Sequence, residues 1–409
     1  MENAFSAILR DTFSGIRYSA GMLPEKPCLF YAFAALLCSP CLYAEEEAHL
    51  VADLDPLITL PNAYLVKPAD LDTMFEQGDW NRNPYFKWLN EDKSRAIFQR
   101  KSIPGLKVDL MTLEGSVPVE EAIIDFEDGE FLGITISIFN RGDGGTISTS
   151  DFETRNRAMG RHLGQQLDVR PTRKDANPTQ GLLTQGWIWI SARGKAVLEH
   201  NPKAPGTTEF LRMRLSRREA GGAYDAATKD RAGATVTLSQ LPRNVRKLPD
   251  GSIFVDNLPM VDQGAKGYCV VASAQRLFEY YGIACDMHQL AQIAKSNPES
   301  GTSALTINKE LGAIDHLFKT RFECLAIRHT TGLVELEDNR YVGDSVSEKD
   351  FYKMISKWVG EGIPLLWALE VGHFEEDPPL EMQTSGGHMR MIIGYNHQTD
   401  RIIFSDSWG

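Results

Sequence analysis

Apolar residues recur at every second position in the middle of the chain, which is the pattern of β-strands with one buried face. The clearest example runs from Ile134 to Ile138, where isoleucine alternates with threonine and serine. Asp128-Gly129 precedes this run, and such a pair favours a tight hairpin turn. The alternation predicts strands at residues 123–126, 131–139, 187–190, 196–198 and 210–215.

One helical pattern interrupts these predicted strands. Ser150 and Glu153 have the spacing of a capping box, and apolar residues then recur at helical spacing as far as Leu167. A helix among hairpins predicts an α+β domain of unknown family in this part of the chain.

The last third of the chain shows helical patterns first and strand patterns afterwards, and Gly282 is a C-cap signal for the first helix. This order is typical of an α+β domain with helices packed on an antiparallel sheet. The predicted helices span residues 268–281, 287–294, 304–311 and 350–359, and the predicted strands span residues 364–369, 389–395 and 401–404.

A length of 409 residues suits two or three domains. Residues 216–250 contain Gly221-Gly222, scattered charges and few large apolar residues before Val236, which is typical of a linker. We therefore predict an N-terminal α+β domain at residues 45–215, a linker at residues 216–250 and a C-terminal domain at residues 251–409.

An apolar segment at residues 28–44 precedes three consecutive glutamates. At about 17 residues, and interrupted by Ser39-Pro40, the segment is short for a membrane span. It suits the apolar region of a signal peptide cleaved after Ala44, with Lys26 as its positive flank if translation starts at Met22. We expect residues 1–44 to be removed, the chain to be exported to the periplasm, cell surface or medium, and the mature chain to have no integral membrane span. A short buried helix is the alternative.

Net charge, cysteine count and the motifs present limit the classes of partner and cofactor that we expect. The 43 basic and 55 acidic residues give a net charge of −12, which argues against a nucleic-acid partner. Cys269, Cys285 and Cys324 would remain after cleavage, an odd number, so one thiol should be free. Cys285 and Cys324 are expected in the core, or joined in a disulfide if the chain is exported. No metal or nucleotide motif occurs, so we predict no cofactor and no metal.

A candidate nucleophile follows a glycine-bearing turn. Residues 262–268 lead into a predicted helix that begins near Cys269. A helix N-terminus favours the thiolate, the reactive form of cysteine. Gln263 stands six residues earlier, where its amide could donate to an oxyanion together with the Cys269 backbone N–H, and the glycines would let the backbone approach a bound carbonyl. The alternatives are a buried structural cysteine and a solvated glutamine.

A candidate base and its partner lie near the end of the chain. His388 follows a glycine pair and begins the predicted strand at residues 389–395. A turn at residues 397–400 would bring Asp406 back beside His388, where a carboxylate fixes the imidazole tautomer. Trp408 could then shield this hydrogen bond from water.

These three segments together resemble the papain-like cysteine peptidases. The text of residues 269–273 and 278–283, followed by Gln289-Leu290-Ala291, resembles more closely their C39-like branch. The resemblance covers residues 258–409 and rests on motifs in the right order: Gln263-Gly264-x-x-Gly267-x-Cys269, Gly387-His388 and Asp406-Ser407-Trp408-Gly409. It implies a papain-like fold that hydrolyses peptide or protein substrates. In that family Cys269 would be the nucleophile, His388 the base, Asp406 the orienting residue and Gln263 an oxyanion-hole donor.

The sequence departs from papain at several points. Val270 replaces an aromatic residue, Asp406 replaces an asparagine, and the interval from Cys269 to His388 is shorter. Transglutaminase-like acyl transfer and a catalytically inactive binding module are the alternative functions. The N-terminal domain could be an inhibitory prodomain, a targeting domain or a substrate-docking domain.

Overall fold

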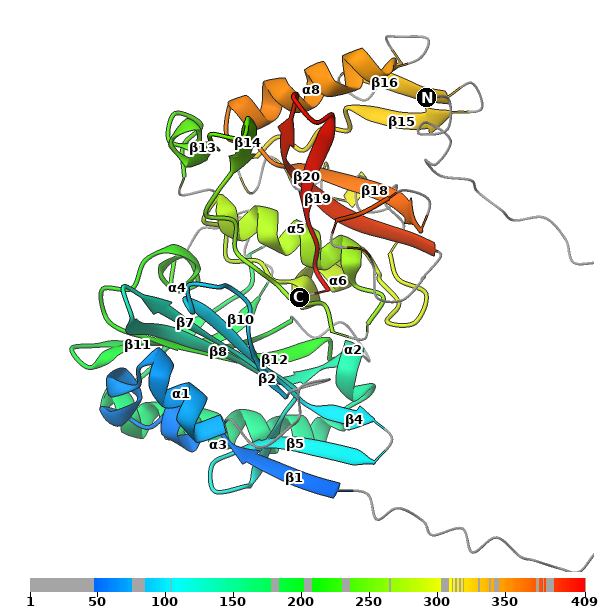
Figure 1. Ribbon diagram of the computed structural model, residues 1–409. Helices are drawn as coiled ribbons and strands as arrows, with labels where there is room; N and C mark the ends of the chain where they lie inside the picture. Colours follow the sequence, from blue (N-terminus) through cyan, green and yellow to red (C-terminus); the bar gives the residue numbers. More distant parts are fainter. Residues whose placement is uncertain are drawn as a thin grey trace, which may run out of the picture.

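A computed structural model gives the structure of the chain (Figure 1). It describes residues 48–75, 85–103, 105–177, 184–201, 208–229, 236–264, 266–302, 309–310, 312, 315, 318, 320–329, 332–337, 340–341, 346–372, 375–377, 379 and 386–408. The predicted signal peptide at residues 1–44 and most of the predicted helix at residues 304–311 lie outside the described residues.

An eight-stranded antiparallel sheet is the centre of the N-terminal part. Its strands, in spatial order, are β2 (Phe86–Trp88), β3 (Arg95–Gln99), β7 (Glu121–Glu127), β8 (Glu130–Asn140), β12 (Phe210–Ser216), β11 (Gly194–His200), β10 (Gln185–Ser191) and β9 (Thr172–Lys174). The predicted hairpins and the strand at residues 210–215 are therefore confirmed. Asp128 and Gly129 both have positive φ, as the tight turn between β7 and β8 requires.

Helix α3 (Thr149–Leu167) covers one face of this sheet, with Met159 and Leu163 in the shared core. The helix was correctly predicted but its cap was not, because Ser148 rather than Ser150 accepts the backbone N–H of Asp151. Consecutive hydroxyl residues precede the helix, and the apolar pattern does not decide which of them is the cap.

A smaller sheet and several short helices complete the N-terminal part. The sheet contains β1 (Ala48–Asp53), β4 (Lys101–Ile103), β5 (Leu106–Thr112) and β6 (Val117–Val119), and only the β1–β5 pairing is parallel among its described pairs. The helices are η1 (Asp55–Leu57), η2 (Asn62–Leu65), α1 (Pro68–Phe75) and α2 (Arg141–Gly144).

The C-terminal part packs helices on an antiparallel sheet, as predicted. Its described strands are β13 (Val245–Lys247), β14 (Ser252–Val255), β18 (Leu365–Val371), β19 (Gly386–Asn396) and β20 (Arg401–Ser405). Its described helices are α5 (Cys269–Tyr280), α6 (Met287–Ile293) and α8 (Glu348–Gly360). A small separate sheet contains β15 (Ala326–His329), β16 (Gly332–Glu337) and β17 (Arg340–Tyr341).

Regular structure also occurs between the two parts. The predicted linker contains α4 (Gly222–Ala226), η4 (Leu241–Asn244) and β13, which pairs with β14 at the edge of the C-terminal sheet. The boundaries at residues 215, 216, 250 and 251 remain predictions.

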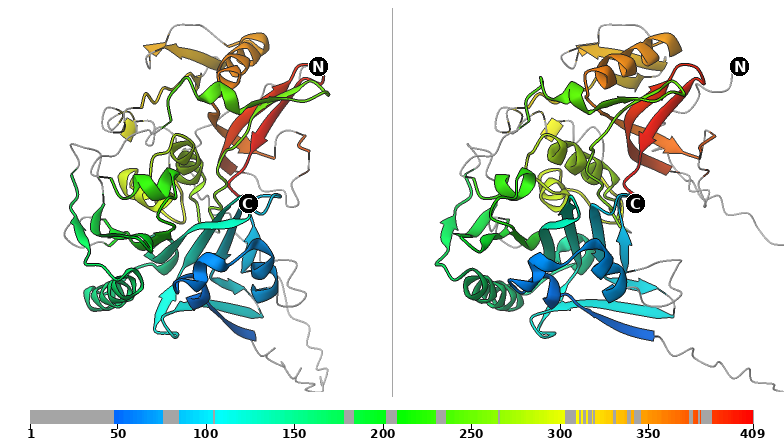
Figure 2. Two further views of the ribbon diagram at one scale, coloured as in Figure 1. Left: turned by 90° about the vertical axis from the view of Figure 1, so that its left-hand side faces the viewer. Right: turned by 60° about the vertical axis from the view of Figure 1, so that its left-hand side comes forward.

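The two parts lie against each other, with α5 and α6 facing the eight-stranded sheet and α3 on the opposite side of that sheet (Figures 1 and 2). The alternation in β12 explains this arrangement. Met213 and Leu215 point into the core under α3, whereas Arg212 and Arg214 point to the other face and are nevertheless buried. Both faces of the sheet are thus covered.

The three described cysteines are not joined in disulfides. The disulfide considered for Cys285 and Cys324 is therefore wrong for this structure. Cys285 is buried beside α5 in the C-terminal core, and the Cys324 thiol lies 3.6 Å from the Ala326 carbonyl oxygen. Within the described residues, no helix is both long and apolar enough to cross a membrane.

Candidate active site

Cys269 is the first residue of α5, as the sequence predicts, and its side chain is half-buried. The helix forms because Val271, Ala274 and Phe278 recur on one face and pack in the C-terminal core. The first backbone N–H groups of a helix lack intrahelical partners, so negative charge is favoured at this end. The position suits a cysteine that reacts as a thiolate.

His388 and Asp406 are brought together by the hairpin of β19 and β20. Met391 on β19 is paired with Ser405 on β20, which places the next residue, Asp406, near His388. The distance from His388 Nε2 to Asp406 Oδ1 is 2.7 Å. A carboxylate can only accept a hydrogen bond, so Nε2 carries the hydrogen and the carboxylate fixes the imidazole tautomer.

The second ring nitrogen of His388 faces Cys269, the candidate nucleophile. Burial alone would lower the pKa of His388, but hydrogen bonds to the Asp406 and Cys269 side chains outweigh it and raise this pKa above its ordinary value. Because Nε2 faces Asp406, Nδ1 is the ring nitrogen left for the thiol. The His388 imidazole therefore interacts with both the Asp406 carboxylate and the Cys269 thiol.

Trp408 covers His388 on one side. Its indole stacks on the His388 imidazole with a centroid distance of 3.8 Å and an interplanar angle of 17°. His388 itself is only 6% exposed. The stacked ring keeps water from the imidazole, as the sequence predicts for Trp408.

Asp406 is held in place by further donors. Arg390 Nε donates to Oδ2 at 2.7 Å, and the backbone N–H groups of Ser407 and Trp408 donate to Oδ1 at 2.7 and 3.2 Å. Burial alone would raise the pKa of Asp406, but the bonds to His388 and Arg390 outweigh it and lower this pKa. The carboxylate therefore stays ionised and correctly oriented for His388.

Arg390 is a site residue that sequence reasoning missed. It lies two positions after His388, on the same face of β19, and forms a second ion pair with Glu376 at 2.9 Å. Both side chains of that pair are almost fully buried. The sequence contained a signal for Arg390, because it is a charged residue in an otherwise apolar strand and points to the same face as His388.

Arg276 is a second missed residue and connects α5 to the segment after β20. It lies about two helical turns after Cys269. Its guanidinium donates to the Asp406 carbonyl oxygen at 3.0 Å, to Ser405 Oγ at 2.6 Å and to the Pro259 carbonyl oxygen at 2.9 Å. In the helical pattern Arg276 resembles an ordinary surface arginine, although it is 1% exposed.

Gln263 is buried between the nucleophile loop and the end of the chain. Its backbone N–H donates to the Ser407 carbonyl oxygen at 2.8 Å, and its Oε1 accepts the Ser407 hydroxyl at 2.7 Å. Its Nε2 donates to the Lys266 carbonyl oxygen at 2.9 Å. An amide nitrogen has two hydrogens, so this contact uses one of them. Gln263 is thus not a solvated turn residue.

Two glycines of this loop are required by the fold itself. Gly264 has a φ of +67°, a conformation that other residues adopt only with strain. At Gly267, a Cβ atom would stand 2.9 Å from the backbone of Gly301, and its N–H donates to the Pro298 carbonyl oxygen at 2.7 Å. Gly267 therefore allows a close approach to the turn at residues 297–301. The approach of the loop backbone to a bound carbonyl stays a prediction.

No group of three or more His, Cys, Asp and Glu side chains among the described residues is placed to hold a metal ion. A cavity of about 320 Å³ lies behind α5, between the two parts of the molecule, and the residues that line it do not include Cys269 or His388. The candidate site itself contains a thiol, an imidazole and a carboxylate.

In this site a cysteine stands at a helix N-terminus, a histidine lies on an antiparallel strand, and an aspartate directly follows the neighbouring strand. Cysteine peptidases activate a thiol by such an arrangement. Residues 255–409 match the model of the family described as Peptidase_C39 like family, and this part of the chain is a C39-like domain. No curated protein and no solved structure matches the chain. The N-terminal part has no family assignment.

Proposed function

We propose that the protein is a cysteine peptidase that hydrolyses peptide bonds in peptide or protein substrates. Membership of residues 255–409 in a peptidase family supports the reaction class. The single observation on which the assignment of roles rests is the position of His388, whose Nε2 is hydrogen-bonded to Asp406 and whose pKa is raised by the side chains of Asp406 and Cys269. In this proposal Cys269 is the nucleophile, His388 the proton carrier, Asp406 the orienting residue and Gln263 an oxyanion donor.

The first half of the proposed reaction forms an acyl-enzyme. The proton of the Cys269 thiol moves to His388, and the sulfur attacks the carbonyl carbon of the scissile peptide bond. The negative charge that develops on the carbonyl oxygen is stabilised by the Cys269 backbone N–H and by the second Nε2 hydrogen of Gln263. The C–N bond then breaks, and His388 gives its proton to the departing amine.

The second half releases the acyl group. A water molecule attacks the thioester carbon while His388 accepts one of its protons. Breaking of the C–S bond returns this proton to the sulfur, so the thiol is restored and the product carries a new carboxyl terminus. Asp406 keeps Nε2 protonated throughout and stabilises the imidazolium whenever it forms.

Hydrolysis of an internally quenched fluorescent peptide library by the full-length chain tests this function. We expect cleavage by the wild-type protein and by Cys324→Ala, because the Cys324 thiol is not among the residues assigned to the reaction. Cys269→Ala should lose cleavage entirely. Equal cleavage by wild type and Cys269→Ala would refute the proposal. If the products are instead joined to an added primary amine and carry no new carboxyl terminus, the reaction is acyl transfer and not hydrolysis.

We also propose that the chain is exported after removal of residues 1–44, on the strength of the apolar segment at residues 28–44 and the acidic residues that follow it. The intact mass of the protein recovered outside the cytoplasm should correspond to a chain that begins at Glu45. A mass that includes residues 1–44 would contradict the cleavage.

A further inference from the structure

The loop that precedes the candidate nucleophile is attached to the N-terminal part by a buried ion pair. Lys266 stands three residues before Cys269, and its Nζ donates to both carboxylate oxygens of Asp143 on α2, at 2.9 and 2.7 Å. Glu121 on β7 contributes a second carboxylate, with Oε2 3.8 Å from the same nitrogen. The Lys266 side chain is only 5% exposed. A buried ammonium group needs such partners, so Lys266 is firmly held.

The Glu121 carboxylate also holds helix α6. Glu121 Oε1 lies 3.1 Å from His288 Nε2 on α6, and the His288 ring makes an edge contact with Tyr268, the residue before Cys269. Burial alone would raise the pKa of Glu121, but Lys266 and His288 outweigh it and lower this pKa. Glu121 therefore remains charged between its two partners.

The start of the loop is attached in the same way. Lys87 on β2 forms an ion pair with Asp262 at 2.6 Å, and Asp262 is almost fully buried. Asp262 Oδ1 also accepts the backbone N–H of Gly264 at 2.7 Å. Residues of the N-terminal part thus hold the loop at both Asp262 and Lys266.

Close packing accompanies these charges. At Gly142, on α2, a Cβ atom would stand 2.8 Å from Lys266 Cδ and 3.0 Å from the Tyr268 ring. Contacts this short are not found around real Cβ atoms without displacement of the neighbour. A glycine at this position lets α2 lie directly against the loop.

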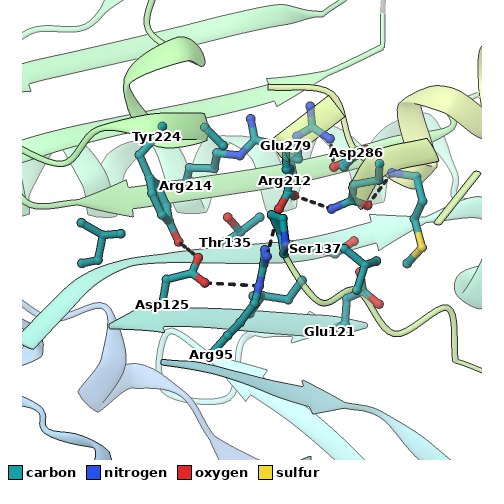
Figure 3. Close-up of a pocket in the computed structure, with 18 of the residues that line it drawn as sticks. Arg95, Glu121, Asp125, Thr135, Ser137, Arg212, Arg214, Tyr224, Glu279 and Asp286 are labelled. Atoms are coloured by element: carbon teal, nitrogen blue, oxygen red, sulfur yellow. Dashed lines mark hydrogen bonds and ion pairs between the residues drawn. The ribbon is translucent and has the colours of Figure 1, made fainter. Parts of the chain in front are cut away.

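Further ion pairs join the eight-stranded sheet of the N-terminal part to the helices of the C-terminal part. Figure 3 shows Arg95 between Asp125 and Glu279, at 3.2 and 2.9 Å, so that the eight-stranded sheet is paired with the far end of α5. Arg212 is paired with Asp286, the N-cap of α6. Separation of the two parts would leave the Glu279 and Asp286 carboxylates without their arginine partners, which is costly when the charges are buried. An inhibitory prodomain that is released on maturation does not fit this interface.

We propose that Lys266 is a positioning residue, and that Asp143 and Glu121 make the N-terminal domain a permanent part of the catalytic unit. The Lys266 carbonyl oxygen accepts from Gln263 Nε2 at 2.9 Å, so the main chain that Asp143 and Glu121 hold is the one that orients Gln263 and leads into Cys269. This inference rests on the proposed function. It assigns to the N-terminal domain the task of fixing the oxyanion-hole donors.

The test compares three variants of the full-length chain. Asp143→Asn removes the anchoring charge from a partly exposed residue and should leave the fold intact. Asp143→Glu keeps the charge. Asp168→Asn is the matched control, because Asp168 pairs with Arg193 at the exposed surface of the same part. The readouts are kcat and KM with the quenched peptides, and hydrogen exchange of the backbone amides of residues 262–268.

We expect Asp143→Asn to lower kcat by about 100-fold with little change in KM, because a misplacement of about 1 Å has an effect of this size. Amide exchange in residues 262–268 should become faster in this variant, whereas Asp143→Glu should restore most of the activity. Asp168→Asn should behave like the wild type. Normal kcat together with unchanged exchange in Asp143→Asn would overturn the inference.

The two proposals fail separately. A wild-type protein without peptidase activity would refute the proposed function but not the attachment of the loop. In that case faster exchange at residues 262–268 in Asp143→Asn, with none in Asp168→Asn, would still support the anchoring by the N-terminal domain. Unchanged exchange would refute it.

Discussion

The identity of Asp406 is explained by its neighbours at the scale of single residues. Its Oδ1 accepts from His388 and its Oδ2 accepts from Arg390, both at 2.7 Å. An asparagine offers only one acceptor oxygen, so its amide group would place N–H donors against either the imidazole or the guanidinium. Papain has asparagine at this position. The aspartate here is explained by Arg390, which needs the second acceptor oxygen.

The substitution Asp406→Asn should lower the pKa of His388. In the wild type the carboxylate stabilises the imidazolium and thereby raises this pKa. Titration of the His388 ring by nuclear magnetic resonance in both proteins measures the change. A pKa of His388 that stays the same or rises in the variant would show that Asp406 does not influence the imidazole as the geometry indicates.

The same pair should affect stability in a defined pH range. A group whose pKa is raised by folding stabilises the native state below its unfolded pKa, about 6.5 for histidine, and this contribution disappears as the pH rises through the folded value. Asp406→Asn should therefore cost more stability at pH 5.5 than at pH 9, as measured by urea unfolding. A larger loss at pH 9 would contradict the raised pKa of His388.

At the scale of secondary-structure elements, the site depends on the attachment of α5 to the hairpin of β19 and β20. Arg276 provides much of this attachment, because one guanidinium binds the main chain before α5 at Pro259 and the main chain after β20 at Asp406. The helix that carries Cys269 is thereby fixed relative to the strand that carries His388 and to Asp406, which directly follows β20.

Arg276→Met should destabilise the fold by about 3 kcal/mol, since it leaves buried carbonyl acceptors without a charged donor. The matched control is Arg246→Met, which removes an exposed arginine paired with Asp256 and should change stability by less than about 1 kcal/mol. Urea unfolding at pH 7 measures both. Equal losses in the two variants would mean that Arg276 does not hold these elements together.

The elements near the site were largely predictable from the sequence, whereas their contacts were not. Local patterns placed the helix that begins at Cys269 and the strands around His388, because apolar periodicity reflects burial on one face. Arg390 and Arg276 were missed because a charged side chain in such a pattern is normally solvated. Their burial depends on partners far away in the sequence, such as Glu376 and Asp406.

At the scale of the whole molecule, the two parts share a charged and buried interface. Within the eight-stranded sheet, the buried carboxylate of Glu199 accepts from Lys174, Arg212 and Arg214. Burial alone would raise the pKa of Glu199, but these basic partners hold it well below the ordinary value. Arg212 also donates to Gln289 on α6 at 3.2 Å. The alternating sequence of β12 predicted the strand but not that its charged face would be covered by another part of the chain.

This interface predicts that the two parts unfold together. Separate unfolding of either part would leave the buried carboxylates of Glu279 and Asp286 without their arginine partners. Calorimetry of the full-length chain should show a single transition whose calorimetric and van't Hoff enthalpies agree. Two separate transitions, one for each part, would contradict the account of the interface.

The central claim is that His388 activates Cys269, and the alkylation of Cys269 by iodoacetamide tests it most directly. The comparison is between the wild type and His388→Ala at pH 6.5, with the modified cysteine identified by mass spectrometry. Burial raises the pKa of Cys285 to about 12, so this thiol serves as an unreactive internal reference. We predict that Cys269 of the wild type reacts fastest of the three described cysteines and slows by about 100-fold in His388→Ala. A rate at Cys269 that is the same in both proteins, or no faster than at Cys285, would contradict the account.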